Sequence, residues 1–154
     1  MRATLLILAA LGIALSGGSA SAGQSSRPAG ALIPMKVYKT PTCGCCAKWV
    51  DHVKAAGFAT EVTDLSNLTM IKSNAGVPQR LASCHTALVD GYVVEGHIPA
   101  DVIHKLLKDK PKVTGIAVPG MPIGSPGMEQ GDRKDRYDVL TFDKNGNTTV
   151  YASR

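Results

Sequence analysis

The sequence has no second C-x-x-C pair and no cluster of basic residues, and each absence argues against a class of protein. Structural zinc modules usually pair two separated C-x-x-C units, so a structural zinc module is disfavoured. The net charge of +5 comes from 17 Lys and Arg against 12 Asp and Glu, but the basic residues are scattered along the chain. A nucleic-acid footprint needs basic residues gathered on one face, so we expect no nucleic-acid partner.

The sequence also lacks an apolar run of the roughly 20 residues that a bilayer-spanning helix needs. The apolar run Leu5–Leu15 follows Arg2 and precedes the small residues Ala20-Ser21-Ala22. A basic start, a short apolar core and an A-x-A end are typical of a secretory signal peptide. We therefore predict a signal peptide at 1–22 and a flexible leader at 23–33. The mature protein is expected to lie outside the cytoplasm and to have no membrane span. A retained N-terminal anchor is the alternative.

The remaining chain has an ordinary globular composition, with 44% hydrophobic and 19% charged residues. It is long enough for one core, so we predict a single domain at 34–154. Periodicity and turn residues predict these elements in chain order: strand 35–39, helix 45–56, strand 58–62, helix 66–74, helical turn 77–82, strands 86–89 and 92–94, and helix 99–108. This βαβ…ββα order predicts an α/β fold with a thioredoxin-like sheet.

The composition changes after Lys112. The segment Gly115–Gly131 holds five glycines and three prolines, with a short strand at 116–118 as its one apolar run. A loop this long within a compact domain is usually functional or disordered. Strands at 137–142 and 148–151 then predict a β-hairpin that is added to the domain.

Three of the four cysteines, Cys43, Cys45 and Cys46, fall within four residues, and Cys84 stands alone. An even cysteine count outside the cytoplasm usually indicates disulfides, but a bridge within the triplet closes a very short loop and gains little from it. The triplet also begins the predicted helix, where free backbone N–H groups favour thiolates. We therefore expect soft-metal binding or redox chemistry.

A second cysteine-containing segment, Cys84-His85, precedes the predicted strand 86–89. In thioredoxin-like folds the loop before this strand lies against the thiol motif, so Cys84 and His85 are expected to face the triplet. His97 ends the hairpin and is expected near the same edge. The alternatives are a surface role for His85 and a place at the start of a helix for His97. We expect His52 and His104 to be solvent-exposed.

The Gly/Pro-rich segment contributes Met121 and Met128. One interpretation is that they pack this loop against the core. The other uses their thioethers as ligands, because cysteine and methionine together select Cu(I). Zinc would be able to use the cysteines and His85, but not the thioethers.

Most of the chain, from Met35 to Tyr151, resembles the CopG-type copper-resistance proteins of bacteria, which are small periplasmic proteins often described only as metal-binding. The resemblance is carried by the runs TPTCGCCAKWVDHVKAAGF, GVPQRLASCHTALVDGYVVEGHIPADVIHKLL, GIAVPGMPIGSPGME and YDVLTFDKNG. It implies a thioredoxin-like fold with a copper site bridged by cysteines, whose thiolates would be Cys43, Cys45, Cys46 and Cys84. His85 and His97 also match residues of the family's motifs.

We therefore expect a periplasmic copper-binding protein for copper tolerance, rather than an enzyme, that holds one or several Cu(I) ions. Storage, delivery and Cu(I)/Cu(II) conversion stay open, as do its partners, for which a periplasmic copper chaperone or an efflux pump are candidates. The alternative is a thiol–disulfide oxidoreductase that uses Cys43 and Cys46. An arsenate-reductase-like enzyme needs arginines around its cysteine, and no arginine lies between Arg27 and Arg80.

Overall fold

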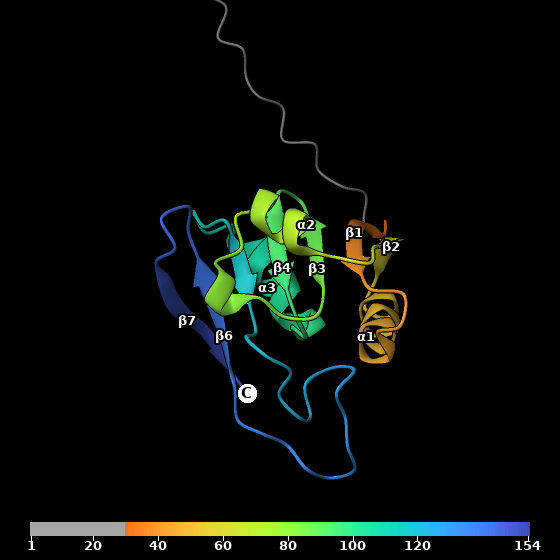
Figure 1. The fold of residues 1–154 in the computed structure, drawn as a ribbon. Helices are drawn as coiled ribbons and strands as arrows, with labels where there is room; N and C mark the ends of the chain where they lie inside the picture. The colour runs from red at the N-terminus through yellow and green to blue at the C-terminus, as the bar shows by residue number, and fades with distance from the viewer. Residues whose placement is uncertain (1–29) are drawn as a thin grey trace, which may run out of the picture.

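The computed structural model describes residues 30–154, which form one seven-stranded sheet with helices on both faces (Figure 1). The elements are β1 (Ile33–Lys39), α1 (Gly44–Ala55), β2 (Phe58–Asp64), α2 (Thr69–Asn74), the 3-10 helix η1 (Gln79–Leu81), β3 (Thr86–Val89), β4 (Tyr92–Glu95), α3 (Ala100–Asp109), β5 (Gly115–Ala117), β6 (Asp138–Phe142) and β7 (Thr148–Ser153). The predicted α/β class is confirmed. The predicted signal peptide, and the leader as far as residue 29, lie outside the described residues.

The strand order across the sheet is β2-β1-β3-β4-β5-β6-β7. β1 pairs with β2 in parallel through the α1 crossover, and β3 runs antiparallel to both β1 and β4. β5 lies parallel to β4 and pairs antiparallel with β6, which forms a hairpin with β7. The C-terminal hairpin therefore continues the main sheet, because β5 supplies the edge on which β6 forms its ladder.

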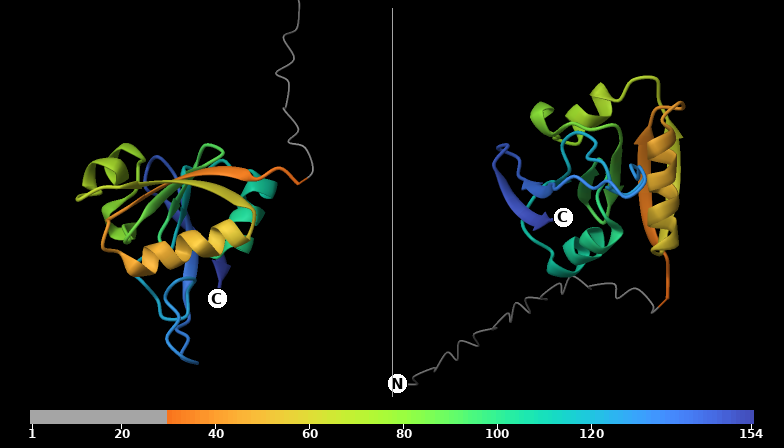
Figure 2. Two further views of the ribbon diagram at one scale, coloured as in Figure 1. Left: turned by 90° about the vertical axis from the view of Figure 1, so that its right-hand side faces the viewer. Right: turned by 90° about the horizontal axis from the view of Figure 1, so that it is seen from below.

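The two faces of the sheet are covered by different helices (Figure 2). On one face α1 and α3 bury an apolar cluster that includes Trp49, Val53, Ile103 and Leu106, together with Val94 from β4. On the opposite face the α2–η1 segment covers a smaller cluster. Its buried members are Val77, Leu81, Val93, Ala117 and Phe142. Neighbouring residues on β4 face opposite clusters, as the period of two in a strand requires.

Two helices begin later than predicted. α2 begins at Thr69, because the Asn67 side chain accepts a hydrogen bond from the Thr69 N–H at 2.7 Å and forms a turn ahead of the helix. α3 begins at Ala100, since Pro99 keeps an extended backbone. The prediction that His52 is solvent-exposed is wrong: it is half-buried, and its Nε2 accepts the Ala100 N–H at 3.1 Å. This N–H is one of the first-turn donors that a helix cannot satisfy itself.

Within residues 30–154 no helix has the length and apolar character needed to cross a membrane.

Candidate metal centre

The triplet of cysteines occupies the turn between β1 and the first turn of α1. The Cys43 N–H donates to the Thr40 carbonyl at 3.1 Å, which closes the turn after β1. Cys43 is the N-cap of α1, and its sulfur accepts the Cys46 N–H at 3.3 Å. A cysteine here does what Ser or Asp does at most helix starts. The cap fixes the sulfur of Cys43 over the helix N-terminus.

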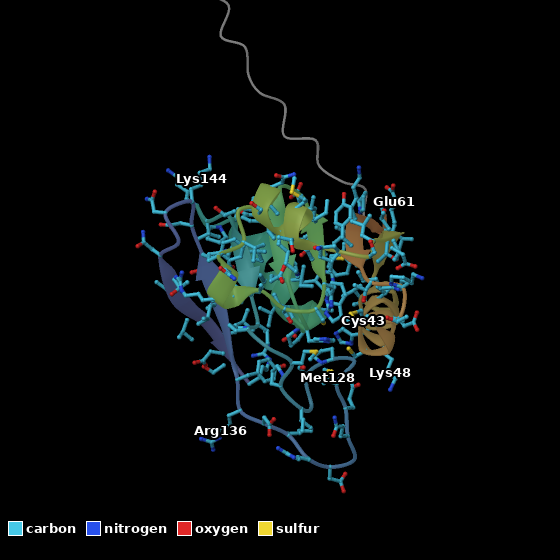
Figure 3. The ribbon with its side chains drawn as sticks, in the orientation of Figure 1. Cys43, Lys48, Glu61, Met128, Arg136 and Lys144 are labelled. Atoms are coloured by element: carbon cyan, nitrogen blue, oxygen red, sulfur yellow. A yellow bond between two sulfur atoms is a disulfide. The ribbon has the colours of Figure 1, made fainter. Side chains whose placement is uncertain are left out.

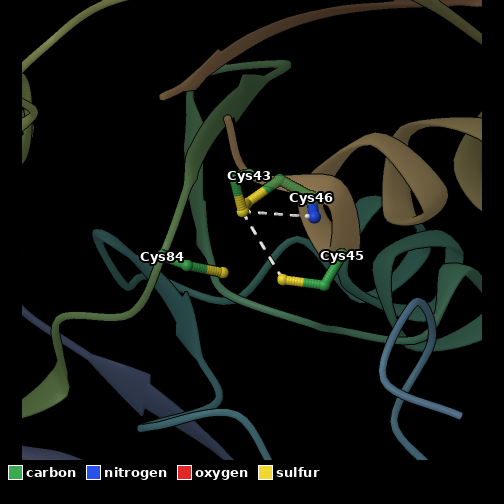
Figure 4. Close-up of side chains that lie close together, drawn as sticks. All are labelled: Cys43, Cys45, Cys46 and Cys84. Atoms are coloured by element: carbon green, nitrogen blue, oxygen red, sulfur yellow. Dashed lines mark hydrogen bonds between the residues drawn. A yellow bond between two sulfur atoms is a disulfide. The ribbon is translucent and has the colours of Figure 1, made fainter. Parts of the chain in front are cut away.

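The structure contains a disulfide between Cys43 and Cys46, and it leaves Cys45 and Cys84 as free thiols. Four free thiols were expected from the sequence, so the described protein is the disulfide form of this site. The sulfur of Cys45 lies 3.5 Å from that of Cys43 (Figure 4). Cys46 is fully buried on the core side of α1, whereas Cys43 and Cys45 are half-buried.

The lone Cys84 lies beside the triplet, although it is far away in sequence (Figure 4). Its segment enters β3, which pairs with β1 and therefore brings Cys84 to the end of the sheet where α1 begins. Four sulfur atoms lie within 4.8 Å of one another, those of Cys43, Cys45, Cys46 and Cys84. We call these four residues the thiol cluster.

Two histidines also contact Cys84. The Cys84 sulfur lies 2.9 Å from His97 Nε2 and 3.3 Å from His85 Nδ1. One ligand atom from each of these three residues lies within 4.8 Å of the others, so Cys84 belongs to two groups of donor atoms. Both histidines are fully buried, which excludes a surface role for His85.

The tautomer of His97 follows from its second contact. Its Nδ1 lies 2.8 Å from the carbonyl oxygen of Pro126, which can only accept, so Nδ1 carries the proton. Nε2 then presents a lone pair to Cys84. An imidazole whose far nitrogen is bonded to a carbonyl is the usual arrangement of a metal-ligating histidine.

The environment keeps these groups uncharged in the metal-free protein. Burial raises the pKa of the Cys84 thiol to about 12, and Cys45 contributes to the rise. Burial also lowers the pKa of His97 and lowers that of His85 well below its usual range. Nε2 of His85 is buried without a hydrogen-bond partner, and the ring packs against Trp49 with centroids 4.3 Å apart and an interplanar angle of 40°. A metal ion that bound to this thiol and the two neutral imidazoles would therefore displace one proton, that of Cys84.

The loop between β5 and β6 (residues 118–137) approaches α1, with Met128 beside the helix (Figure 3). Gly127 packs so closely on α1 that an added Cβ would lie 2.5 Å from the Cys45 carbonyl oxygen. Met128 is half-buried, and Met121 is 50% exposed. With Cys45 they line an open cavity of about 460 Å³. Exposure of this degree disfavours the interpretation that Met121 packs against the core.

Sequence reasoning did not single out Glu95 and Lys72. Glu95 is fully buried at the end of β4, and its carboxylate lies 2.5 Å from the Lys72 ammonium. Burial raises the pKa of Glu95, while Lys72 acts in the opposite direction. The only signal was an acidic residue that directly follows the apolar run of β4, and such a residue is usually exposed.

The comparisons with known proteins agree with this geometry. Residues 81–128 match the family described as "Protein of unknown function, DUF411", a range that contains Cys84, both buried histidines and both loop methionines. No curated protein matches the chain. Two solved structures, named "Copper resistance protein copG- Form 1" and "Form 2", each share 42% identity with a TM-score of 0.76. Each match covers 80% of this chain and 98% of the solved one, and the chain therefore belongs to the CopG family.

Proposed function

We propose that this protein binds Cu(I) in the periplasm as part of copper tolerance, with Cys43, Cys45, Cys46 and Cys84 as thiolate ligands. The observation that carries the proposal is the meeting of four sulfur atoms within 4.8 Å, drawn from two distant segments. The names of the two solved relatives support copper as the ion. Thiolates are the soft donors that Cu(I) prefers.

More than one copper ion fits this donor set. Cys84 belongs both to the thiol cluster and to the group with His85 and His97, so its sulfur is placed to bridge two ions. We assign His85 and His97 as neutral nitrogen ligands in that second group. Met121 and Met128 would act as weaker thioether donors at the Cys45 side of the site, where they line the same cavity.

The disulfide makes copper binding dependent on reduction. A sulfur in a disulfide has no thiolate charge to offer, so Cys43 and Cys46 become ligands only after two electrons have opened their bond. The dithiol would in turn reduce two Cu(II) ions to two Cu(I) ions, with formation of the disulfide and release of two protons. We propose this reaction as the route by which the protein would convert Cu(II) to Cu(I).

The decisive experiment compares the two redox forms. Protein with the disulfide intact and fully reduced protein are titrated anaerobically with Cu(I) against a chelator that reports free copper. We expect the reduced form to bind more than one equivalent and the disulfide form to bind fewer. Saturation of the reduced form at a single equivalent would contradict a multinuclear site, and stronger binding of Zn(II) than of Cu(I) would contradict the choice of metal.

The disulfide also favours a second candidate, a thiol–disulfide oxidoreductase that uses Cys43 and Cys46. Two observations support this candidate. The pair lies at a helix N-terminus. The elements follow the βαβ…ββα order along the chain, with β2-β1-β3-β4 as the order across the sheet, and we propose a thioredoxin-like fold on this basis. Cys45→Ser separates the two functions. A copper-binding function predicts that this variant keeps disulfide exchange with a small dithiol but binds fewer copper ions. Intact exchange with an unchanged copper stoichiometry would favour the oxidoreductase.

The location and the partners follow from this proposal. A site that contains a disulfide fits an oxidising compartment such as the periplasm, which is also what the predicted signal peptide suggests. A periplasmic copper chaperone or an efflux pump would then exchange copper with the protein.

A further inference from the structure

The segment Ser83–Thr86 carries two of the proposed ligands, Cys84 and His85, but it lies outside regular structure until β3 begins at Thr86. η1 ends at Leu81, so the backbone N–H of Ser83 belongs neither to the 3-10 helix nor to the ladder of β3. Ser83 is half-buried, and an amide that is shielded from water requires a hydrogen-bond partner. In this protein the partner is a side chain from the neighbouring strand.

That partner is Glu95, whose two carboxylate oxygens hold both ends of the segment. Oε1 accepts the Ser83 N–H at 2.6 Å, and Oε2 accepts the Thr86 hydroxyl at 2.7 Å. Lys72 reinforces the arrangement from α2, because its ammonium donates to Glu95 at 2.5 Å and to the Thr86 hydroxyl at 3.0 Å. Cys84 and His85 are the two residues between the held ends.

A buried ion pair is a costly way to stabilise a fold, since an apolar pair of similar volume is often as stable. Its value here lies in geometry. A carboxylate offers two acceptors at a fixed separation, and both are used on one four-residue segment. We propose that Glu95 is a positioning residue that clamps Cys84 and His85 in the orientation required for metal binding, with Lys72 as its counterion.

The inference rests on the proposed copper function, but one of its tests needs no metal. Glu95→Gln keeps the length and an acceptor for Ser83, and its amide can donate to Thr86. Glu95→Asp keeps the charge but is one methylene shorter, so it cannot reach both ends. A clamp therefore predicts that Gln preserves the site and Asp loosens it, whereas a purely electrostatic role predicts the reverse.

The metal-free test uses a Cys45→Ser background with the disulfide intact, in which Cys84 is the remaining free thiol. Its alkylation by iodoacetamide is followed under conditions where all variants are folded. We expect Glu95→Asp to speed alkylation severalfold and Glu95→Gln to leave it near the parent rate. Thr141→Val serves as the control, because the hydroxyl of this buried residue bonds to Thr149 on β7, away from the segment. Equal rates for all four proteins overturn the clamp.

The copper test uses reduced protein that retains Cys45. We expect Glu95→Asp to lower Cu(I) affinity about 10- to 100-fold, the usual effect of losing a residue that supports a metal ligand. In a Cys84→Ser background the same change has a smaller effect, because a clamp acts through the ligands that it holds and only His85 remains. Additive losses overturn the proposal. If the parent binds no Cu(I), the proposed function fails, while the alkylation rates still decide whether the clamp exists.

Discussion

Cys84 and His97 are held in contact, with 2.9 Å between the thiol sulfur and Nε2 of the imidazole. The contact joins two segments that enter and leave the β3–β4 hairpin, and the carbonyl of Pro126 fixes the ring from its far side. A single hairpin thus brings a soft thiol and an oriented nitrogen donor together beside the start of α1.

The first prediction concerns Cys84. Serine is nearly the same size but a poor soft ligand, so Cys84→Ser should keep the fold and lower both the Cu(I) stoichiometry and the affinity. The expected loss is at least one copper equivalent, because Cys84 belongs to both groups of donor atoms. Chelator competition measures copper, and circular dichroism checks the fold. Unchanged affinity and stoichiometry would remove Cys84 from the site.

The second prediction concerns the two methionines. Replacing both Met121 and Met128 by leucine keeps their bulk and removes their sulfur. If the thioethers act on copper, release of Cu(I) to a chelator, or oxidation in air, should speed up with little change in thermal stability. Met70→Leu is the matched control, because Met70 is 70% exposed on α2. A loss of stability with unchanged copper behaviour would show that the pair only packs the loop.

The third prediction tests the contact between the loop and α1. Gly127→Ala would place a Cβ 2.5 Å from the Cys45 carbonyl, at a residue whose φ is +85°. We expect the loop to move away from α1, with faster alkylation of Cys45 and weaker copper binding.

Gly131→Ala is the control for this change. Gly131 is in the same loop and also has a positive φ of +57°, but an added Cβ would meet nothing within 4 Å. Both variants carry the backbone strain, so the difference between them reports the clash. The same alkylation rate in both variants would show that the loop does not cover the thiol cluster.

The fourth prediction concerns the β6–β7 turn. Asp143 accepts the Asn145 and Asn147 backbone N–H groups, each at 2.9 Å, and the Asn147 side-chain amide at 2.8 Å. The bond from the Asn147 side chain is the largest of the causes that lower the pKa of Asp143. Since the pKa is lower in the folded state, this stabilisation is present above the unfolded value of about 3.9 and is lost as the pH falls through the folded value.

The melting temperature should therefore be higher for the parent than for Asp143→Asn at pH 7, and the difference should shrink in acid. Asp132→Asn, at an exposed residue, is the control. A difference that stays constant between pH 7 and the acid range would show that ionisation of Asp143 contributes nothing to the turn.

Local patterns predicted most of the fold. The buried stripe of α1, which contains Trp49 and Val53, follows from its helical periodicity, and the Asp90-Gly91 turn marks the β3–β4 hairpin. Helix starts were less predictable. At α2 the side chain of Asn67 competes for a backbone N–H, and a sequence pattern does not reveal which of two neighbouring polar residues does so.

The candidate metal centre was only partly predictable from the sequence. The cysteine triplet and Cys84 stand out in the sequence because of residue type and spacing, whereas the protonated nitrogen of His97 depends on a carbonyl 29 residues away. Glu95 was missed for the same reason. Whether an acidic side chain is exposed or buried depends on partners that the local pattern does not contain.

The sequence by itself determined which soft donor atoms this protein can offer, since residue types fix the donors and their order along the chain. Only the tertiary structure decided which donors meet. The pairing of β3 with β1 brings Cys84 to the start of α1, and the β5–β6 loop returns Pro126 to His97. Contacts of this kind depend on strand register and loop path, which are set by the packing of the whole sheet rather than by any one segment.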